Sequence, residues 1–176
     1  MNMTLPNPEA LLTQISADIK ALLDKNGLQN SALVGIHSGG VWLMDRLLKT
    51  LKKECDFDLV NGTLDAAMYR DDYNQRGLKS EPKPANIAFD VADKHIILID
   101  DIFYTGRTTR AAMNELFDYG RPASITLAVL INRGSAQLPI SPQIVGANIM
   151  LNANQNLQLS FDTKGKLHLS LEGANA

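Results

Sequence analysis

Apolar residues recur at helical spacing near the start of the chain. They are Leu11, Leu12, Ile15, Ile19, Leu22 and Leu23. Asn7 can cap such a helix, Pro8 suits its first turn, and Gly27 marks its end. The pattern predicts one amphipathic helix from Pro8 to Gly27.

Two apolar runs are each followed by a polar turn and then by a helical pattern. Residues 32–36 lead into the turn 37–40 and a helix over 41–51. Residues 96–99 form a continuous apolar run, and a helix follows over 110–119. A run without a polar face is typical of a central parallel strand that helices cover on both sides.

The remaining segments continue the alternation of strands and helices. Residues 56–66 predict a strand, residues 69–85 a long exposed loop, and residues 124–131 another buried strand. In the tail, apolar and polar residues alternate over 157–161 and again over 167–171, which predicts an antiparallel hairpin. Strands that alternate with helices indicate an α/β fold.

We therefore expect a single domain over residues 1–176. Its mostly parallel central sheet is flanked by helices and followed by the C-terminal antiparallel hairpin. A chain of 176 residues with 45% hydrophobic and 20% charged residues fits one ordinary core and excludes a disordered chain. Ligands of such sheets bind at the carboxyl ends of the strands.

Charge and cysteine content exclude several classes of protein. Seventeen Lys plus Arg against nineteen Asp plus Glu leave a formal net charge of −2, so no overall basic excess indicates nucleic-acid binding. Cys55 is the single cysteine and cannot form an intramolecular disulfide. The longest apolar run has the length of a strand, and the first twelve residues lack a signal pattern. We expect a soluble, cytoplasmic protein without a membrane segment.

Residues 96–109, IILIDDIFYTGRTT, carry the most informative pattern. A hydrophobic strand delivers Asp100 and Asp101 to its open end, where adjacent carboxylates suit vicinal hydroxyls or a hydrated cation. The following turn, Thr105–Thr109, offers backbone amides and hydroxyls at a helix N-terminus, and Gly106 permits a close approach. Together these features predict a site for ribose 5-phosphate.

A structural alternative is that the two aspartates only end the strand and cap the next helix. Capping needs one Asp and does not require Thr-Gly-Arg-Thr-Thr, so the binding interpretation is favoured. The glycine–lysine pattern of a P-loop and the three-glycine dinucleotide fingerprint are both absent from the sequence, which excludes those nucleotide sites.

The same stretch resembles the phosphoribosyl pyrophosphate signature of type I phosphoribosyltransferases. Asp-Asp followed by Phe-Tyr-Thr-Gly-Arg-Thr is most similar to the pyrimidine operon attenuator/uracil phosphoribosyltransferase family. Residues 33–43, 62–72 and 120–134 agree with that family, so the resemblance runs over roughly residues 32–146.

The resemblance implies a role for each matching residue. Asp100 and Asp101 would hold the ribose hydroxyls, and Arg70, in the loop that closes over the substrates, would reach the pyrophosphate. The implied substrate-binding residues are Tyr104, Thr105, Gly106, Arg107, Thr108 and Thr109 for the phosphate, His37, Ser38, Gly39 and Gly40 for the pyrophosphate, and Arg133, Ile144 and Gly146 for the base. From the residues alone, the Gly-Gly sequence is also typical of an ordinary turn without a binding role. The two arginines are likewise typical of charges on the protein surface.

The implied reaction is the displacement of pyrophosphate from C1 of phosphoribosyl pyrophosphate by a ring nitrogen of uracil, which yields UMP. Mg²⁺ would be bound mainly through the pyrophosphate, and no protein nucleophile is needed. Three separated histidines, His37, His95 and His168, and one cysteine predict no zinc site and no other protein-held metal.

Two departures from that family affect the prediction. Residues 134–163 contain no Lys or Arg, so binding of leader RNA is possible in principle but disfavoured. Gly39 stands where relatives usually have arginine, and losing that cation weakens pyrophosphate binding by ~1.5 to 3 kcal/mol. The alternatives are a weakly active or non-enzymatic regulator that senses UMP or phosphoribosyl pyrophosphate and binds leader RNA, and a transferase for another base. By the same resemblance we expect a homodimer or homotetramer.

Overall fold

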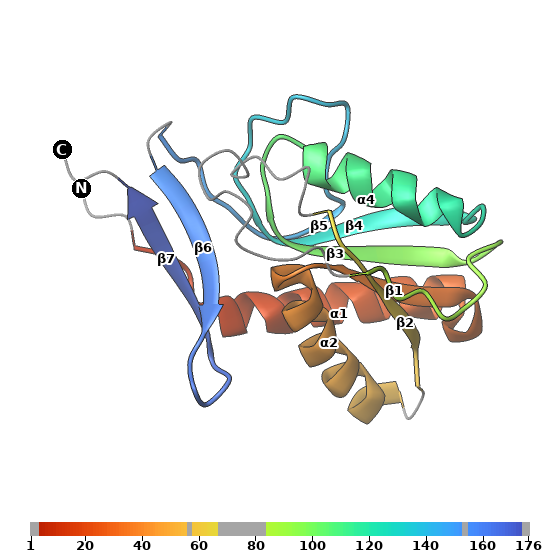
Figure 1. The fold of residues 1–176 in the computed structure, drawn as a ribbon. Helices are drawn as coiled ribbons and strands as arrows, with labels where there is room; N and C mark the ends of the chain where they lie inside the picture. Colours follow the sequence, from red (N-terminus) through yellow and green to blue (C-terminus); the bar gives the residue numbers. More distant parts are fainter. Residues whose placement is uncertain (1–3, 56–57, 67–83, 153–154, 174–176) are drawn as a thin grey trace.

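A computed structural model describes residues 4–55, 58–66, 84–152 and 155–173 of the chain. Five strands form one sheet in the order β2-β1-β3-β4-β5, with every neighbouring pair parallel. They are β1 (Ser31–Ile36), β2 (Val60–Leu64), β3 (His95–Phe103), β4 (Ser124–Asn132) and β5 (Ile144–Asn148). The expected parallel α/β architecture is therefore confirmed (Figure 1).

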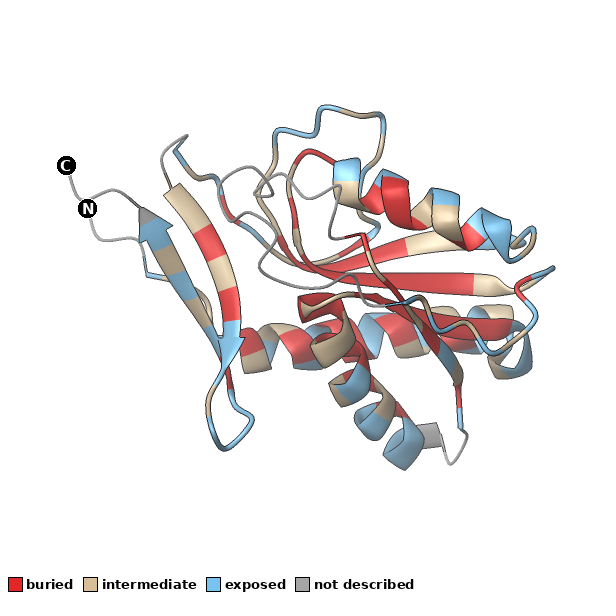
Figure 2. Ribbon diagram, viewed as in Figure 1, coloured by how far each residue is buried: buried red, intermediate tan, exposed pale blue. Residues whose placement is uncertain are grey.

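Helices cover both faces of this sheet. The helices α1 (Pro8–Asn26) and α2 (Gly39–Cys55) lie on one face, and α4 (Arg107–Asp118) lies on the other (Figure 1). Alternate residues of β3 serve the two faces, since Ile97 and Ile99 pack with α1 and α2 while Ile96 and Leu98 pack with α4. The central strands β1 and β3 are accordingly buried along most of their length, whereas the edge strands β2 and β5 are largely half-buried (Figure 2).

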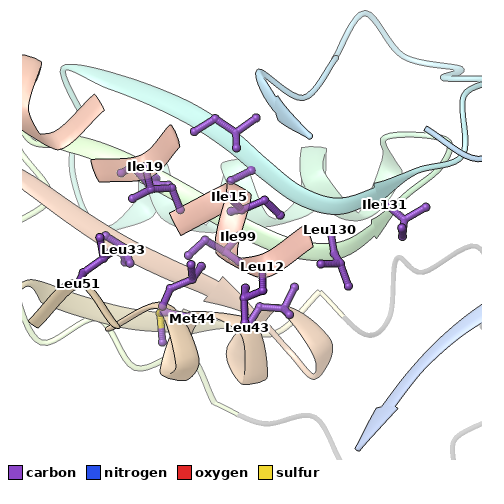
Figure 3. Close-up of a cluster of buried hydrophobic side chains, with 14 of the residues drawn as sticks. Leu12, Ile15, Ile19, Leu33, Leu43, Met44, Leu51, Ile99, Leu130 and Ile131 are labelled. Atoms are coloured by element: carbon purple, nitrogen blue, oxygen red, sulfur yellow. The ribbon is translucent and has the colours of Figure 1, made fainter. Parts of the chain in front are cut away.

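The larger apolar cluster lies between the sheet and the pair α1 and α2 (Figure 3). Its α1 members Leu12, Ile15, Ile19 and Leu23 are the periodic residues that predicted this helix, and each is buried. The Asn7 side chain caps the helix by accepting a hydrogen bond from the Glu9 N–H at 3.0 Å, and Pro8 occupies the first turn. The structure thus confirms the predicted helix and its start.

The C-terminal hairpin is also confirmed. The strands β6 (Gln155–Phe161) and β7 (Leu167–Gly173) pair antiparallel in a separate two-stranded sheet. Leu157, Leu159 and Leu167 bury their side chains in the cluster shared with α1. The hairpin is therefore packed against the main body rather than projecting from it (Figure 1).

Several predicted boundaries were wrong. The strand expected to end at residue 99 continues through both aspartates to Phe103, because its backbone stays paired with β4 up to Asn132. The helices α2 and α4 begin two and three residues earlier than predicted, at Gly39 and Arg107. The predicted strand over 56–66 spans only Val60–Leu64, and β5 was not predicted, since five residues at a sheet edge carry too little periodicity.

None of the helices in the described part of the chain is both long enough and apolar enough to cross a membrane. Residues 69–83 of the predicted loop lie outside the described residues.

Candidate active site

A cavity of about 210 Å³ opens at the carboxyl ends of β1 and β3. Four separate parts of the chain line it: the start of α2, the segment from β3 into α4, Arg133 after β4, and strand β6. The lining residues are Ser38, Gly39, Trp42, Asp100, Asp101, Ile102, Tyr104, Thr108, Arg133, Asn156, Leu157, Gln158 and Leu159. This is the edge of a parallel sheet at which ligands are expected.

Asp100 and Asp101 both line this cavity, although each is less than 10% exposed. The Asp100 carboxylate accepts a hydrogen bond from the Asp101 N–H at 2.9 Å, and the Asp101 carboxylate accepts one from the Ile102 N–H at 3.0 Å. These bonds to the backbone fix the two side chains before any ligand arrives. An ionised carboxylate accepts hydrogen bonds and donates none. The pair is therefore suited to bind the hydroxyl groups of a sugar, or to bind a cation.

The N-terminus of α4 adjoins the two acids. Gly106 precedes the helix with φ +91°, a left-handed conformation that suits glycine, and Thr105 and Thr109 are buried beside it. The Thr105 hydroxyl accepts a hydrogen bond from the Arg107 N–H at 3.3 Å. The first turn of a helix has N–H groups without intrahelical acceptors and a positive dipole end, so this turn suits a phosphate.

Of the predicted phosphate-binding residues, Tyr104 and Thr108 line the cavity itself. Thr105, Gly106, Arg107 and Thr109 form the turn and the first helical residues beside these two. The Arg107 guanidinium contacts the Gln137 side chain, and the Gln137 N–H donates to the Thr105 carbonyl at 2.9 Å, so the turn is braced by the segment before β5.

The predicted pyrophosphate turn packs closely against β3. A Cβ atom on Gly39 would lie 2.1 Å from Oδ2 of Asp101, and one on Gly40 would lie 2.2 Å from the Ile99 carbonyl oxygen. Both distances are shorter than any normal contact, so neither site accepts a side chain without movement. Glycine at position 39 is therefore required by the position of the Asp101 carboxylate, whereas the resemblance led us to expect arginine there.

Ser38 lines the cavity with Gly39, and the Ser38 carbonyl accepts a hydrogen bond from the Trp42 N–H at 3.3 Å. The His37 N–H donates to the Leu64 carbonyl at 2.9 Å, which ties the turn to β2. His37 and Gly40 support the turn without lining the cavity.

Arg133 spans the cavity between Tyr104 and the hairpin. Its guanidinium carbon lies 4.1 Å from the centre of the Tyr104 ring, a cation–π contact. Its two terminal nitrogens donate to the Asn156 side-chain oxygen at 3.1 Å and to the Gln155 carbonyl at 2.9 Å. Its Nε is buried and has no hydrogen-bond partner among the described residues.

The comparisons with known proteins agree with this geometry. Residues 6–161 match the family model described as the phosphoribosyl transferase domain. The chain belongs to this family. It is similar to the bifunctional protein PyrR of Pseudomonas fluorescens Pf-5, with 45% identity over 167 residues that cover 95% of this chain and 97% of the relative. The PyrR protein of Pseudomonas syringae pv. tomato is 44% identical over 90% of this chain and 91% of its own.

Solved phosphoribosyltransferase structures share the fold. A Trypanosoma cruzi hypoxanthine phosphoribosyl transferase matches with a TM-score of 0.66 and 20% identity, covering 88% of this chain and 80% of its own. A Staphylococcus aureus hypoxanthine phosphoribosyltransferase matches with a TM-score of 0.60 and 21% identity, covering 85% and 78%. The resemblance inferred from residues 96–109 and the fold expected from it are thus confirmed.

Some predicted residues of the phosphoribosyl transferase site lie elsewhere. The expected base contacts Ile144 and Gly146 do not line this cavity: Ile144 belongs to the core, and a Cβ on Gly146 would meet the Leu130 carbonyl at 2.6 Å and Leu11 of α1 at 3.1 Å. β5 is a sheet strand covered by α1, so these two residues serve packing. Arg70 lies outside the described residues.

Sequence reasoning missed the wall that faces the acids. Trp42 and the β6 residues Asn156, Leu157, Gln158 and Leu159 line the cavity, and the Trp42 and Phe161 rings meet edge to face with centroids 4.7 Å apart. The alternation of amides and leucines in β6 indicated a strand with one polar face. It carried no signal that this face would lie opposite residues 100–108.

The carboxylate donors of this site fit Mg²⁺, which binds oxygen and usually retains water and substrate phosphates as ligands. Asp100 and Asp101 are the residues that could hold it, together with a bound pyrophosphate. Among the described residues no group of three or more His, Cys, Asp and Glu side chains is placed to hold a metal ion by itself.

Proposed function

We propose that the chain is a uracil phosphoribosyltransferase, which makes UMP and pyrophosphate from uracil and phosphoribosyl pyrophosphate. The observation that carries this proposal is the meeting of two buried adjacent carboxylates and a helix N-terminus at one cavity. Identity of about 45% to PyrR proteins over most of the chain supports it.

Asp100 and Asp101 would bind the ribose 2- and 3-hydroxyls as acceptors. The turn from Thr105 to Thr109 would bind the 5-phosphate through its N–H groups and hydroxyls. The two acids lie within β3 and the turn follows its end, so this one strand sets the spacing between diol and phosphate. This rigid connection aligns C1 of the sugar with the open part of the cavity.

Cleavage of the bond from C1 to pyrophosphate places positive charge on the sugar and negative charge on the leaving group. Backbone groups of the turn at Ser38 and Gly39 would bind the departing pyrophosphate, and the nearby carboxylates would face the developing cation. Mg²⁺, when bound, would neutralise charge on the pyrophosphate. The wall made by Trp42 and β6 would exclude water from C1, which limits hydrolysis of the substrate.

The base would enter the cavity beside Arg133, against the wall that β6 forms. The polar side chains of Arg133 and Gln158 line this part of the cavity and would hydrogen-bond to the base. The apolar side chains Leu157 and Leu159 are suited to the faces of a planar ring. Attack by a ring nitrogen of uracil at C1 then forms the glycosidic bond and releases pyrophosphate, without a protein nucleophile.

The direct test is to incubate the purified protein with phosphoribosyl pyrophosphate, Mg²⁺ and each nucleobase in turn. We expect UMP with uracil and at least about a hundredfold lower kcat/KM with hypoxanthine, guanine or orotate. Formation of a different nucleotide would show a transferase for another base. No product with any base would overturn the proposal.

The relatives' name, bifunctional protein PyrR, favours a second candidate function. It is regulation of pyrimidine biosynthesis by binding leader RNA, with UMP or phosphoribosyl pyrophosphate as the signal. This function uses the same site for sensing and requires an RNA-binding surface in addition. The expected homodimer or homotetramer and the cytoplasmic location stay predictions.

A further inference from the structure

The turn of the C-terminal hairpin is fastened to α1 and α2 by one pair of charged side chains. Glu9 of α1 and Arg46 of α2 form an ion pair. Arg46 also donates to the Gly165 carbonyl at 2.8 Å, and Glu9 accepts a hydrogen bond from the Leu167 N–H at 3.0 Å. We name this set of contacts, Glu9 and Arg46 with Gly165 and Leu167, the hairpin latch.

Both partners of the hairpin latch are held on rigid elements. Glu9 lies in the first turn of α1, where the helix dipole favours a negative charge and where its own N–H is bound by Asn7. The two side chains are 28% and 36% exposed, and Leu167 beside them is buried. A partly buried carboxylate that serves an arginine and a backbone N–H is more specific in geometry than an isolated surface ion pair.

The hairpin latch fixes one end of a strand whose other end is fixed by Arg133. Arg133 binds Gln155 and Asn156 at the start of β6, whereas the latch holds the turn that follows its last residue, Phe161. Between these anchors, residues 156–159 form the wall of the cavity. Leu157 and Leu159 hold the strand on the core, but apolar burial is non-directional and does not by itself set how far β6 stands from the acids.

We propose that Glu9 and Arg46 are positioning residues for the base-binding part of the active site. Neither lines the cavity, and both act by setting the distance between β6 and the ends of β1 and β3. This inference rests on the proposed function, since it assigns β6 to the base. The sugar and 5-phosphate would be bound by β3 and α4, which the hairpin latch does not contact, and the proposed pyrophosphate turn lies about two helical turns before Arg46. Loss of the hairpin latch should therefore weaken binding of the base and leave binding of phosphoribosyl pyrophosphate unchanged.

The test uses Glu9→Gln, which keeps an acceptor for the Leu167 N–H but removes the ion pair, and Arg46→Ala, which removes both arginine contacts. We expect KM for uracil to rise about two- to fivefold in Glu9→Gln and more in Arg46→Ala. KM for phosphoribosyl pyrophosphate and kcat should stay within about twofold of the wild type. A general loss of structure would instead lower kcat and the amount of active enzyme together.

Asp24→Asn is the matched control. It breaks the ion pair with Lys20, at 2.9 Å on the same helix, about four turns from Glu9. We expect unchanged KM values in this variant. Hydrogen exchange should accelerate at the Leu167 N–H in Arg46→Ala and stay unchanged in Asp24→Asn.

The outcomes separate the two proposals. An active wild type whose uracil KM is the same in Glu9→Gln and Arg46→Ala overturns the positioning role. A wild type that turns over no base overturns the proposed function, and the dissociation constant for UMP then replaces KM as the measure of base binding. Equal UMP affinity in wild type and both variants overturns the positioning role in that case too.

Discussion

At the scale of single residues, the contact between Gly39 and Asp101 decides the shape of the site. The Asp101 carboxylate occupies the space that a Cβ atom on residue 39 would need. A side chain at residue 39 would therefore clash with Asp101. Gly39, where the resemblance implies arginine in relatives, is thus coupled to the position of Asp101. An arginine fits at residue 39 only if the Asp101 carboxylate moves away.

Gly39→Ala tests this coupling. The added methyl group must displace the Asp101 carboxylate, so we predict at least about a tenfold loss in kcat/KM with a small change in Tm. Gly27→Ala is the control: Gly27 has φ +84°, and a Cβ there would make only an ordinary contact with Asn30 Nδ2 at 3.8 Å. Alanine at this position costs stability but leaves kcat/KM unchanged. Unchanged kinetics in Gly39→Ala would contradict the steric argument.

The acids themselves give the second prediction. Asp100→Asn and Asp101→Asn keep the size of each side chain and remove its charge. We predict a fall in kcat of about a hundredfold or more for each variant, since preorganised charge facing a developing cation contributes on that scale. Thermal unfolding should stay within a few degrees of the wild type. Kinetics equal to the wild type in both variants would place the sugar elsewhere.

At this scale the sequence predicted the contiguous part of the site and missed the distant part. Asp100, Asp101, Tyr104 and Thr108 line the cavity and belong to one short motif whose chemistry is local. Trp42 and Gln158 line it because the tertiary fold brings α2 and β6 to the end of β3, which no spacing in the sequence encodes. Gly146 lies against Leu130 and α1 and not at the cavity, and a glycine that permits such packing looks the same in sequence as one that approaches a ligand.

At the scale of elements, periodic patterns predicted which helices and strands exist but not where they end. Residues 96–99 were recognised as a strand, whereas its continuation to Phe103 depends on pairing with β4. Charged side chains within Asp100–Asp101 suggested an end, yet the backbone ladder does not require apolar side chains. Both acids are thereby held by a paired strand, which is stiffer than a loop.

The ionised side chain of Glu115 in α4 destabilises the folded protein, and this effect depends on pH. Burial, Asp65 and Asp118 raise the pKa of Glu115 above its ordinary value of 4.5. The folded state therefore favours the protonated form of Glu115. The stability that this form contributes is fully present at pH values below the ordinary pKa and is lost as pH rises through the raised pKa. We predict that Glu115→Gln increases Tm by about 1–2 °C at pH 7 and that the gain shrinks toward zero near pH 4. A gain that is equal at both pH values would show that charge is not its cause.

At the scale of the whole molecule, the active site is assembled from parts more than 100 residues apart in sequence. The start of α2, the segment from β3 into α4 and the hairpin all line the cavity; in the proposed function they bind pyrophosphate, the sugar phosphate and the base. Because β6 is held by a small sheet of its own, the wall can be altered without disturbing the central sheet. Base selection and sugar binding are therefore separable properties of this fold.

The charge distribution along the chain disfavours RNA binding as a second function beside catalysis. The net charge is −2, and the stretch 134–163, which includes β5 and β6, contains no lysine or arginine. RNA affinity depends on neutralised phosphates, and each contact adds about 0.7 to the slope of log affinity against log salt for a single strand. We predict a slope smaller in magnitude than about 2 and an affinity for pyrimidine leader RNA equal to that for random RNA of the same length.

The measurement is a salt titration of both RNAs with and without UMP, on protein whose transferase activity has been verified in the same preparation. A steep slope together with a preference for the leader of about tenfold or more would show that basic residues outside 134–163 form a specific surface. That result would establish regulation as a second function of an active transferase. A shallow slope without preference leaves catalysis as the function that this charge distribution supports.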